Sequence, residues 1–544
     1  MKALVQKLST GGRILAGGAL LIGLFAALLA MTGGRHFEHL GFRGAVTVWC
    51  GALLIHLGLV ALARVLRSGG GACAVARVLV AETVRRRVAW ICATLLLVGL
   101  AAIPYLVRSN SVLEYRLSSF LGYSLFLTTF LLSILTLFGA SGSLCEEIED
   151  RRIHSVVVKP LGRLRFLFGK WLGLLSLNSL LLAVAGLVTF SSFHWQLASA
   201  EVDPEQRARV DRLLVTHRAV KSELPDGILE EVTERAETRR ARDPALWNSL
   251  VAGEGGNEAE AFIHLQRDLF KEVIAQRRTV PPEETRSFRF KLDGENEGTT
   301  RLVVAPFFGR AHSTERTRLV IRIDGAETPV FLGGRESTEL PVSAEALADG
   351  EIIVEIESPD GDDISYTAGF TGKDRIFLEV TRGSLAGNLA RALLILATQL
   401  GFLAAVGLAA GTFLGLPVAV LLTSMVLFAA AGGGFFGEEL ENEMPAALAA
   451  HDHSHDHSHG HGHSHGARKE SVFVSTLDEV GRTFLRAFSA WGRYAPIDSV
   501  TSGTEISRQD LLGCFLWIGG AWTGFAGLIG GLVFRRREIA RVQV

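Results

Sequence analysis

The sequence is poor in cysteine and has no excess of charge of either sign. Its five cysteines (Cys50, Cys73, Cys92, Cys145 and Cys514) are scattered, mostly inside or beside apolar runs, and they show no paired spacing. No disulfide framework or cysteine-based zinc motif can be read from them, so we expect them to pack as small hydrophobic side chains. The net charge is −1, so no overall field points to nucleic acid as a partner.

Apolar sequence is what the chain has in abundance. Hydrophobic residues make up 48% of its 544 residues, charged residues 20%, and the mean hydropathy is +0.30. Soluble proteins rarely reach that average. A helix needs ~20 apolar residues to cross a bilayer core. About eight runs qualify: Ile14–Met31, Gly44–Ala63, Val88–Val107, Leu117–Ala140, Trp171–Phe193, two within Ala392–Gly437 that "GTFLGLP" separates, and Leu511–Phe534.

Lys and Arg beside the spans predict which side each loop occupies. Four basic segments lie on one side if the chain crosses about eight times: residues 2–13, 64–87, 151–170 and 535–541. The chain is therefore expected in the plasma (inner) membrane as a multi-pass protein with both termini in the cytoplasm. A signal peptide is the alternative interpretation of the first span, although its apolar run is long and no convincing cleavage site follows.

Two larger segments then fall on the outer side. The first, 194–385, is charged and helical in pattern over 200–280, as in "ILEEVTERAETRRA" from Ile228. Its β-rich part, 285–381, alternates apolar and polar residues, as in "SFRFKL", "TRLVIRIDG", "GEIIVEIE" and "DRIFLEV". We expect an extracytoplasmic α+β domain, helices first and a β-sandwich second. No Ser/His/Asp or paired-carboxylate arrangement stands out in it, which favours a structural or recognition role.

The second outer segment, 438–510, contains a histidine-rich tract, "HDHSHDHSHGHGHSH". Neutral imidazoles bind Zn²⁺, Cu²⁺ or Ni²⁺, and a flexible tract can gather several of them around one ion. We therefore predict weak metal binding at alternate positions of the tract: His451, His453, His455, His457, His459, His461, His463 and His465. Tracts of this kind also occur as buffers, as sensors or as drift in a tolerant loop.

The loop 141–170 between two apolar runs is densely charged. Its acids come first (Glu146, Glu147, Glu149 and Asp150), then Arg151 and Arg152. "VVV" follows, and Lys159–Pro160 must interrupt any helix. Acids in a first turn suit the positive end of a helix, so Glu146 to about Val158 is predicted as a short helix along the inner face. The basic residues beyond it suit anionic lipid headgroups.

This loop resembles the first cytoplasmic loop of ABC-2 type transporter permeases. In that family an acidic residue opens a short helix, and a Lys-Pro turn, an Arg, an aromatic residue and Gly-Lys follow. The matching positions here are Glu147, Lys159–Pro160, Arg163, Phe166 and Gly169–Lys170. "VARVLVAETVRRRVAW", from Val75, is similar to the amphipathic connector helix of the family. Its alternative interpretation is an ordinary basic juxtamembrane segment.

The resemblance implies a coupling helix that docks on a cytosolic ABC ATPase subunit. The implied coupling residues are Glu146, Glu147, Glu149, Asp150, Arg151, Arg152, Lys159, Pro160, Arg163, Gly169 and Lys170. The chain is not expected to be an enzyme, because "GRLRFLFGK" has the wrong spacing for a phosphate loop and lacks its Ser or Thr. ATP and Mg²⁺ would bind in the partner subunit. The implied complex pairs this chain with a second permease chain, as a homo- or heterodimer, and with the ATPase.

The predicted order of parts is a helix pair and a six-helix core with two outer insertions. It runs 1–70 (helix pair), 71–193 (connector helix and three core spans), 194–385 (outer domain), 386–437 (two core spans), 438–510 (outer segment) and 511–544 (last span and basic tail). The two extra spans, the large outer domain and the His tract all depart from the family pattern. Outer additions favour an export role or the handling of an outer partner, and they leave the substrate undefined.

Two other functions remain open at this stage. A metal carrier that uses the His tract would need ionisable ligands within its spans. The spans offer almost none, because His56 is alone and Asn178 and Gln399 are neutral. A non-transporting receptor or assembly protein would explain the outer domain, but it would give no reason for so many spans.

Overall fold

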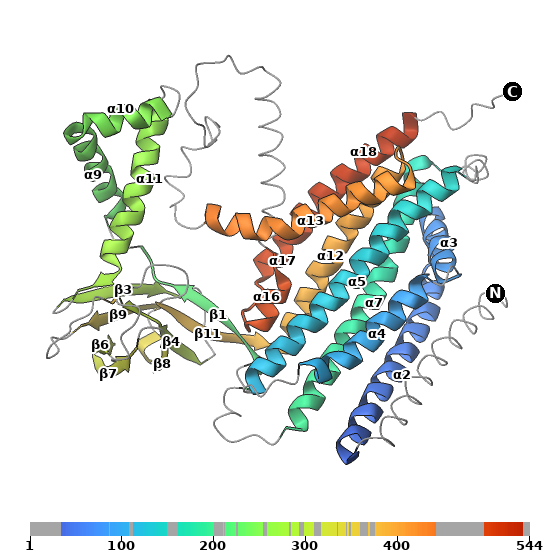
Figure 1. The fold of residues 1–544 in the computed structure, drawn as a ribbon, viewed down its shortest axis with the longest axis horizontal. Helices are drawn as coiled ribbons and strands as arrows, with labels where there is room; N and C mark the ends of the chain where they lie inside the picture. Colours follow the sequence, from blue (N-terminus) through green and yellow to red (C-terminus); the bar gives the residue numbers. More distant parts are fainter. Residues whose placement is uncertain are drawn as a thin grey trace. The chain divides into compact units, whose positions relative to one another are not determined.

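The computed structural model describes residues 34–441, with short gaps of which the longest is 150–161, and residues 494–536. These residues belong to two compact units. Among the described residues, the first combines the parts of the chain within 34–216, 383–437 and 494–536, and the second combines those within 217–382. The first unit is mostly helical, whereas the second contains a separate β-sheet region (Figure 1).

Six helical stretches of the described chain are long and apolar enough to cross a membrane. They are Arg43–Val65 in α2 (Gly34–Val65), Ala89–Leu106 in α4 (Val88–Leu106), α5 (Leu113–Glu149), α7 (Arg163–Ala198), α12 (Leu385–Gly411) and the composite stretch Arg508–Arg536. These helices confirm the predicted helical membrane character. The predicted span Ile14–Met31 lies outside the described residues.

The composite stretch Arg508–Arg536, which we name the last span, has three parts. It consists of α17 (Arg508–Cys514), the π-helix η3 (Phe515–Trp522) and α18 (Thr523–Arg536). The predicted turn "GTFLGLP" is also found, because α12 ends at Gly411 and α13 (Leu416–Glu441) begins after it. The apolar part of α13, Leu416–Ala430, is shorter than the six long stretches.

The expectation that the acids open a short helix is wrong for residues 146–149. α5 does not stop near Ala140 but continues to Glu149, so Glu146, Glu147 and Glu149 end a long helix. The physical reason is local, since "SGSLCEEIE" contains no proline and a single glycine does not stop a helix that neighbours support. Acids now stand at a helix C-terminus, where the dipole is unfavourable for them. A nearby cation is therefore needed.

Small residues set how closely the helices of the first unit approach. A Cβ at Gly407 of α12 would lie 2.7 Å from the Cβ of Ala140 of α5, and one at Gly411 would lie 3.4 Å from the Cβ of Leu144. The two glycines are four residues apart, so they share one face of α12. This is the small-xxx-small packing that lets membrane helices come into backbone contact. α5, α7 and α12 lie side by side in Figure 1.

The second unit begins with a short strand and a group of three helices. The range 200–280 was expected to be helical, but β1 (Val215–Lys221) lies within it, in a stretch rich in β-branched residues. α9 (Ile228–Arg242), α10 (Pro244–Gly253) and α11 (Glu258–Arg277) follow, and α9 is the helix predicted from Ile228. A separate core joins α9 and α11: Ile228, Val232, Ala236, Leu265, Leu269, Phe270 and Val273.

The β-rich part follows the predicted alternation. Its strands are β2 (Thr279–Val280), β3 (Thr285–Lys291), β4 (Thr300–Val304), β5 (Phe307–Phe308), β6 (Thr317–Ile323), β7 (Ala326–Leu332), β8 (Thr338–Val342), β9 (Glu351–Glu357), β10 (Ala368–Gly369) and β11 (Ile376–Ser384). Two four-stranded sheets, ordered β1-β11-β4-β8 and β3-β9-β6-β7, share one apolar core. Phe288 and Phe290 face Val354 and Ile352 across β3 and β9, and all four are buried as predicted.

Candidate functional site

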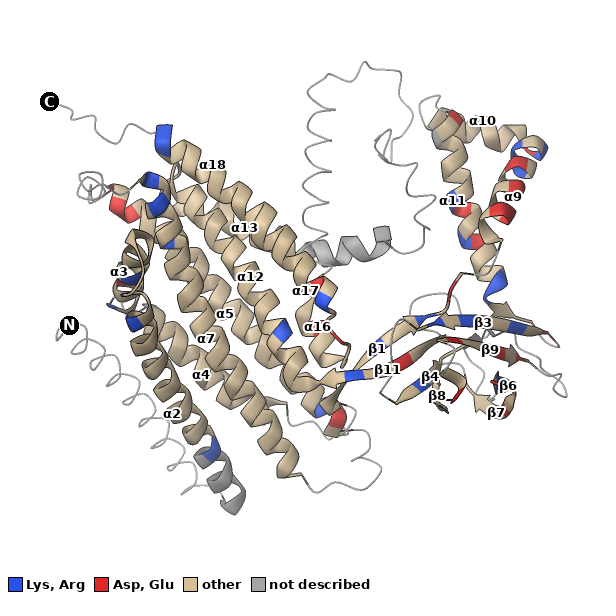
Figure 2. Cartoon of the chain, turned by 180° about the vertical axis from the view of Figure 1, so that it is seen from behind, with Lys and Arg blue, Asp and Glu red and all other residues tan. Residues whose placement is uncertain are grey.

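The candidate site is the end of the helical bundle where α5 ends and α7 begins, which we name the loop end. Glu146 and Glu147 are partly buried there and Glu149 is exposed, all in the last turns of α5. Arg163, Gly169 and Lys170 occupy the first turns of α7. Figure 2 shows charges of both signs at this end. The remaining predicted coupling residues, Asp150, Arg151, Arg152, Lys159 and Pro160, lie outside the described residues.

Lys170 is a cation that compensates Glu147, one of the acids of α5. Its Nζ lies 2.8 Å from Oε2 of Glu147 and donates a hydrogen bond of 2.7 Å to the carbonyl oxygen of Ser143, also on α5. The contact with Glu147 is an ion pair by distance and lacks hydrogen-bond geometry at Oε2. The Nζ also lies 5.2 Å from the ring centre of Phe166. Lys170 therefore joins α5 to α7.

Lys170 is buried, so the loss of either partner of this ion pair should be costly. Its side chain is 2% exposed and that of Glu147 is 20% exposed. Removing an ammonium from water costs several kcal/mol, and a paired carboxylate with an added hydrogen bond offsets that cost. The sequence prediction assigned Lys170 to the coupling loop, where it enters the next span, but Lys170 lies inside the bundle. It cannot belong to a docking surface in this conformation.

Gly169 is buried for a different reason. A Cβ there would lie 2.7 Å from both the carbonyl oxygen of Ala72 and the Cβ of Val75, which belong to α3 (Gly71–Arg85). Gly173, four residues on, meets α3 in the same way, since its Cβ would lie 3.0 Å from the carbonyl oxygen of Ala76. The stretch "GKWLG" is thus a backbone contact surface for α3. A helix, α3, does occupy most of the stretch that resembles the connector helix, and it packs directly on α7.

Arg163 contacts the last span rather than solvent alone. Its Nη1 donates to the carbonyl oxygens of Phe534 and Arg535, at 3.0 and 2.8 Å. These carbonyls belong to the last turn of α18, whose acceptors lack partners within the helix. A guanidinium is also favoured by the negative end of the helix dipole. Three helices, α5, α7 and α18, are therefore tied together at the loop end.

The sequence prediction missed a polar cluster at the opposite end of the bundle. Asn388 of α12 donates to the carbonyl oxygen of Thr504 at 2.8 Å and accepts from the backbone N–H of Ile506 at 2.8 Å. Arg391 donates to the carbonyl oxygen of Ile506 at 2.8 Å and pairs with Glu505 at 2.8 Å. Their spacing of three residues on one face of an apolar helix was the signal that could have found them.

Two more side chains hold the backbone just before the last span. The Nε2 of Gln399 donates to the carbonyl oxygen of Tyr494 at 3.1 Å, and the Oγ of Ser118 donates to that of Thr501 at 2.7 Å. Gln399 lies about 20 Å along α12 from its first residue, at 1.5 Å per residue. Tyr494 therefore lies about halfway along α12, and the short helix α16 (Pro496–Thr501) leads from it toward the start of the last span. This part of the predicted outer segment 438–510 lies among membrane helices.

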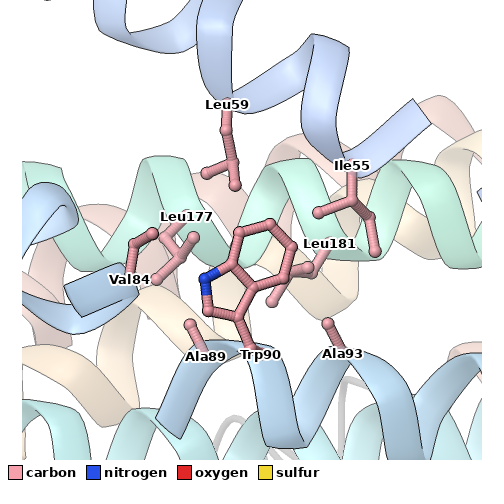
Figure 3. A pocket seen from close by; sticks show the side chains of 8 residues that line it. All are labelled: Ile55, Leu59, Val84, Ala89, Trp90, Ala93, Leu177 and Leu181. Atoms are coloured by element: carbon pink, nitrogen blue, oxygen red, sulfur yellow. The ribbon is translucent and has the colours of Figure 1, made fainter. Parts of the chain in front are cut away.

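A small apolar pocket lies elsewhere in the bundle, around Trp90 (Figure 3). Ile55 and Leu59 approach the indole from α2, and Leu177 and Leu181 approach it from α7. Every residue around the pocket is apolar or aromatic: Ile55, Leu59, Val84, Ala89, Trp90, Ala93, Leu177 and Leu181. Such walls suit a methyl group or a piece of acyl chain and offer no group for catalysis.

The predicted metal site lies outside the described residues, because the tract His451–His465 belongs to 442–493. Within the part of the chain that the structure describes, no group of three or more His, Cys, Asp or Glu is arranged to hold a metal ion. The contacts at the loop end, by contrast, link helices to one another.

Comparison with protein-family models, with curated proteins and with solved structures found no match to this chain.

Proposed function

We propose that the chain is the membrane-spanning permease subunit of an ABC-2 type transporter, an exporter that couples to a separate cytosolic ATPase. The observation that carries this proposal is the buried ion pair between Lys170 and Glu147. It fixes the helix before the loop to the helix after it, within a loop that resembles the coupling loop of that family. A loop whose only role was to connect two spans would not need its ends locked together.

The ties at the loop end give a route for force. A partner that pushes the segment 150–161 pushes the end of α5 and the start of α7, which Lys170 holds together. α3 follows α7 because Gly169 and Gly173 bring the two backbones into contact. Docking itself then falls to exposed groups beside the loop, Glu149 and Arg165 among the described residues. Glu147 and Lys170 act inside the bundle by holding α5 and α7 together, and we name this ion pair the brace.

The topology belongs to the same proposal. Both termini and the loop end lie in the cytoplasm, the β-rich unit lies outside, and the assembly contains a second permease chain. Arg64, Arg163, Arg165, Arg535 and Arg536 all stand at helix ends on the loop side, as expected for cytoplasmic ends. With the native cysteines replaced by alanine, Arg165→Cys should react with a membrane-impermeant maleimide only after the membrane is opened. Labelling of intact cells would contradict this orientation.

The decisive experiment separates docking from bracing. The tagged chain is expressed in its native host, cross-linked and purified, and ATPase subunits are identified by mass spectrometry. We expect an ABC ATPase to be recovered with the wild type and lost with Glu149→Lys, which leaves the brace intact. Glu345→Lys, which reverses a charge in the 3-10 turn Glu345–Leu347 of the second unit, is the matched control. If no ATPase is recovered with the wild-type chain, the transporter assignment is wrong.

A further inference from the structure

The last span is interrupted by a π-helix. Over Phe515–Trp522 the turns are wider than in an α-helix, and the hydroxyl of Thr523 donates to the carbonyl oxygen of Ile518, five residues back, at 2.8 Å. π-Helical turns are rare, occur frequently at functional sites, and are among the places where helices kink. Gly519 and Gly520 lie within this stretch and add no side chain that would stiffen it.

The last span begins at the end of the bundle opposite to the loop end, and this beginning is anchored. Asn388 and Arg391 of α12 bind the backbone at Thr504 and Ile506, directly before α17. Ser507 then caps α17 in a reciprocal arrangement with Asp510, in which each side chain binds the other residue's backbone N–H. The start of the last span is thus fixed to α12.

At its other end the last span receives side-chain hydrogen bonds from α7, and it also packs on α12, where a Cβ at Gly530 would lie 2.9 Å from the Cα of Ala409. Arg163 holds the carbonyls of Phe534 and Arg535, and the rings of Phe166 and Phe534 stack with centres 6.4 Å apart. A Cβ at Gly531 would clash with the side chain of Leu164, so the two helices are in close contact there. Whatever moves the start of α7 therefore acts on the end of α18.

The last span is less buried than its neighbours. In the most apolar window of the last span 17% of the residues are buried, against 78% for α12 and 61% for α7. An element with few buried contacts has a low cost of local rearrangement. The last span therefore has two anchored ends, a deformable middle and a loosely packed body.

We propose that Arg163 is a positioning residue that makes α18 move with the start of α7, while the π-helix Phe515–Trp522 bends and α17 stays with α12. This inference rests on the proposed function for the source of the motion, the docked ATPase. It adds a second element, the last span, to the helices that respond to the coupling loop.

The test measures the two halves of the last span separately. Spin labels are placed on exposed positions of the full-length chain in lipid nanodiscs, with the native cysteines replaced by alanine. One pair joins Leu532→Cys on α18 to Val78→Cys on α3, and the other joins Leu512→Cys on α17 to Leu394→Cys on α12. Double electron–electron resonance gives the distance distribution of each pair.

Arg163→Ala should broaden and shift the α18 distribution and leave the α17 distribution unchanged. Arg163→Lys, which keeps a donor, should restore most of the α18 distribution. Arg165→Ala is the matched control, since this exposed arginine lies two residues away on the same helix, and it should change neither distribution. Unchanged α18 distances in Arg163→Ala would overturn the role of Arg163. An equal shift of both pairs would overturn the hinge.

A second measurement avoids the cysteine replacements. Hydrogen exchange of the otherwise native chain should become faster in Thr523–Phe534 with Arg163→Ala and should stay the same in Arg508–Cys514. Exchange that rises equally in both halves would contradict the proposal. Neither measurement contains an ATPase. Failure to recover an ATPase would therefore overturn the proposed function without changing these results, and the reverse also holds.

Discussion

The ammonium of Lys170 lies 2.8 Å from the carboxylate of Glu147, so the helix that enters the charged loop and the helix that leaves it are joined by an ion pair inside the protein. The pair places opposite charges at a helix C-terminus and at the start of the next helix. The dipole at the C-terminal end of α5 disfavours a carboxylate there, but Glu147 pairs with Lys170 and so links α5 to α7.

Breaking the ion pair from one side should cost more than removing it whole. Lys170→Met leaves the Glu147 carboxylate without its cation, and we expect a loss of about 3 kcal/mol in the free energy of unfolding. This is the lower end of the usual range for a buried pair, because Glu147 keeps 20% exposure. Lys170→Met with Glu147→Gln should recover most of the loss. Thermal unfolding of the purified chain measures both.

The control for this cycle is Arg165→Met, which removes an exposed cation from the same helix and should change the melting temperature little. If the effects of Lys170→Met and Glu147→Gln were simply additive, the two side chains would not be coupled, and the ion pair would have no energetic role.

The contact between α3 and α7 should fail when Gly169 gains a side chain. Gly169→Ala brings a methyl group to 2.7 Å from the carbonyl oxygen of Ala72, so α3 must shift, at a cost of about 1–3 kcal/mol. Cys73, partly buried on α3, should then react faster with maleimide, as followed by mass spectrometry of its peptide. Gly162→Ala is the matched control, because no atom lies within 4 Å of its Cβ position. Equal reactivity in both variants would refute close packing.

The polar cluster opposite to the loop end should depend on both atoms of the Asn388 amide. Asn388→Leu removes a donor to Thr504 and an acceptor for the Ile506 N–H, so two backbone groups lose their partners inside an apolar bundle. Asn388→Asp keeps the acceptor. Hydrogen exchange at the Ile506 amide should be much faster in the leucine variant and close to wild type in the aspartate variant. Wild-type rates in both variants would show that the amide does not hold this segment.

The helices of the second unit should respond to acid through Glu231. Its carboxylate on α9 pairs with Arg277 of α11 at 2.7 Å and with Arg235 at 2.6 Å. The hydrogen bond from Arg277 lowers the pKa of Glu231 from its ordinary value, with Arg235 adding to the effect. A lowered pKa contributes stability above the unfolded pKa, about 4.3, and the contribution is lost as the pH falls through the folded pKa.

A buried thiol reports this effect. Val273→Cys places it in the core between α9 and α11, and its reaction with dithiodipyridine can be followed in acid. The Glu231→Gln variant should expose the thiol more than the wild type above about pH 4.3. The difference between them should shrink as the pH falls, because protonated Glu231 resembles glutamine. A difference that stayed constant across the acid range would exclude this ion pair as its cause.

The sequence was informative wherever the signal was local. Long apolar runs predicted α2, α4, α5, α7 and the last span, because crossing a bilayer depends on the composition of a single helix. Alternation predicted the buried faces of β3 and β9, because successive residues of a strand face opposite sides. The same reading misjudged where α5 ends, since its last turns are polar and look like a loop.

The sequence by itself determined which stretches cross the apolar phase and which pair as strands, because hydropathy and periodicity are properties of neighbouring residues. Only the tertiary structure decided which partners the polar residues of these apolar helices have. Lys170 meets the acids of another helix, Arg163 meets the carbonyls of the last span, and Asn388 meets a backbone 116 residues away. The physical reason is that a buried polar group must find a partner, and the fold alone determines which partner lies within reach.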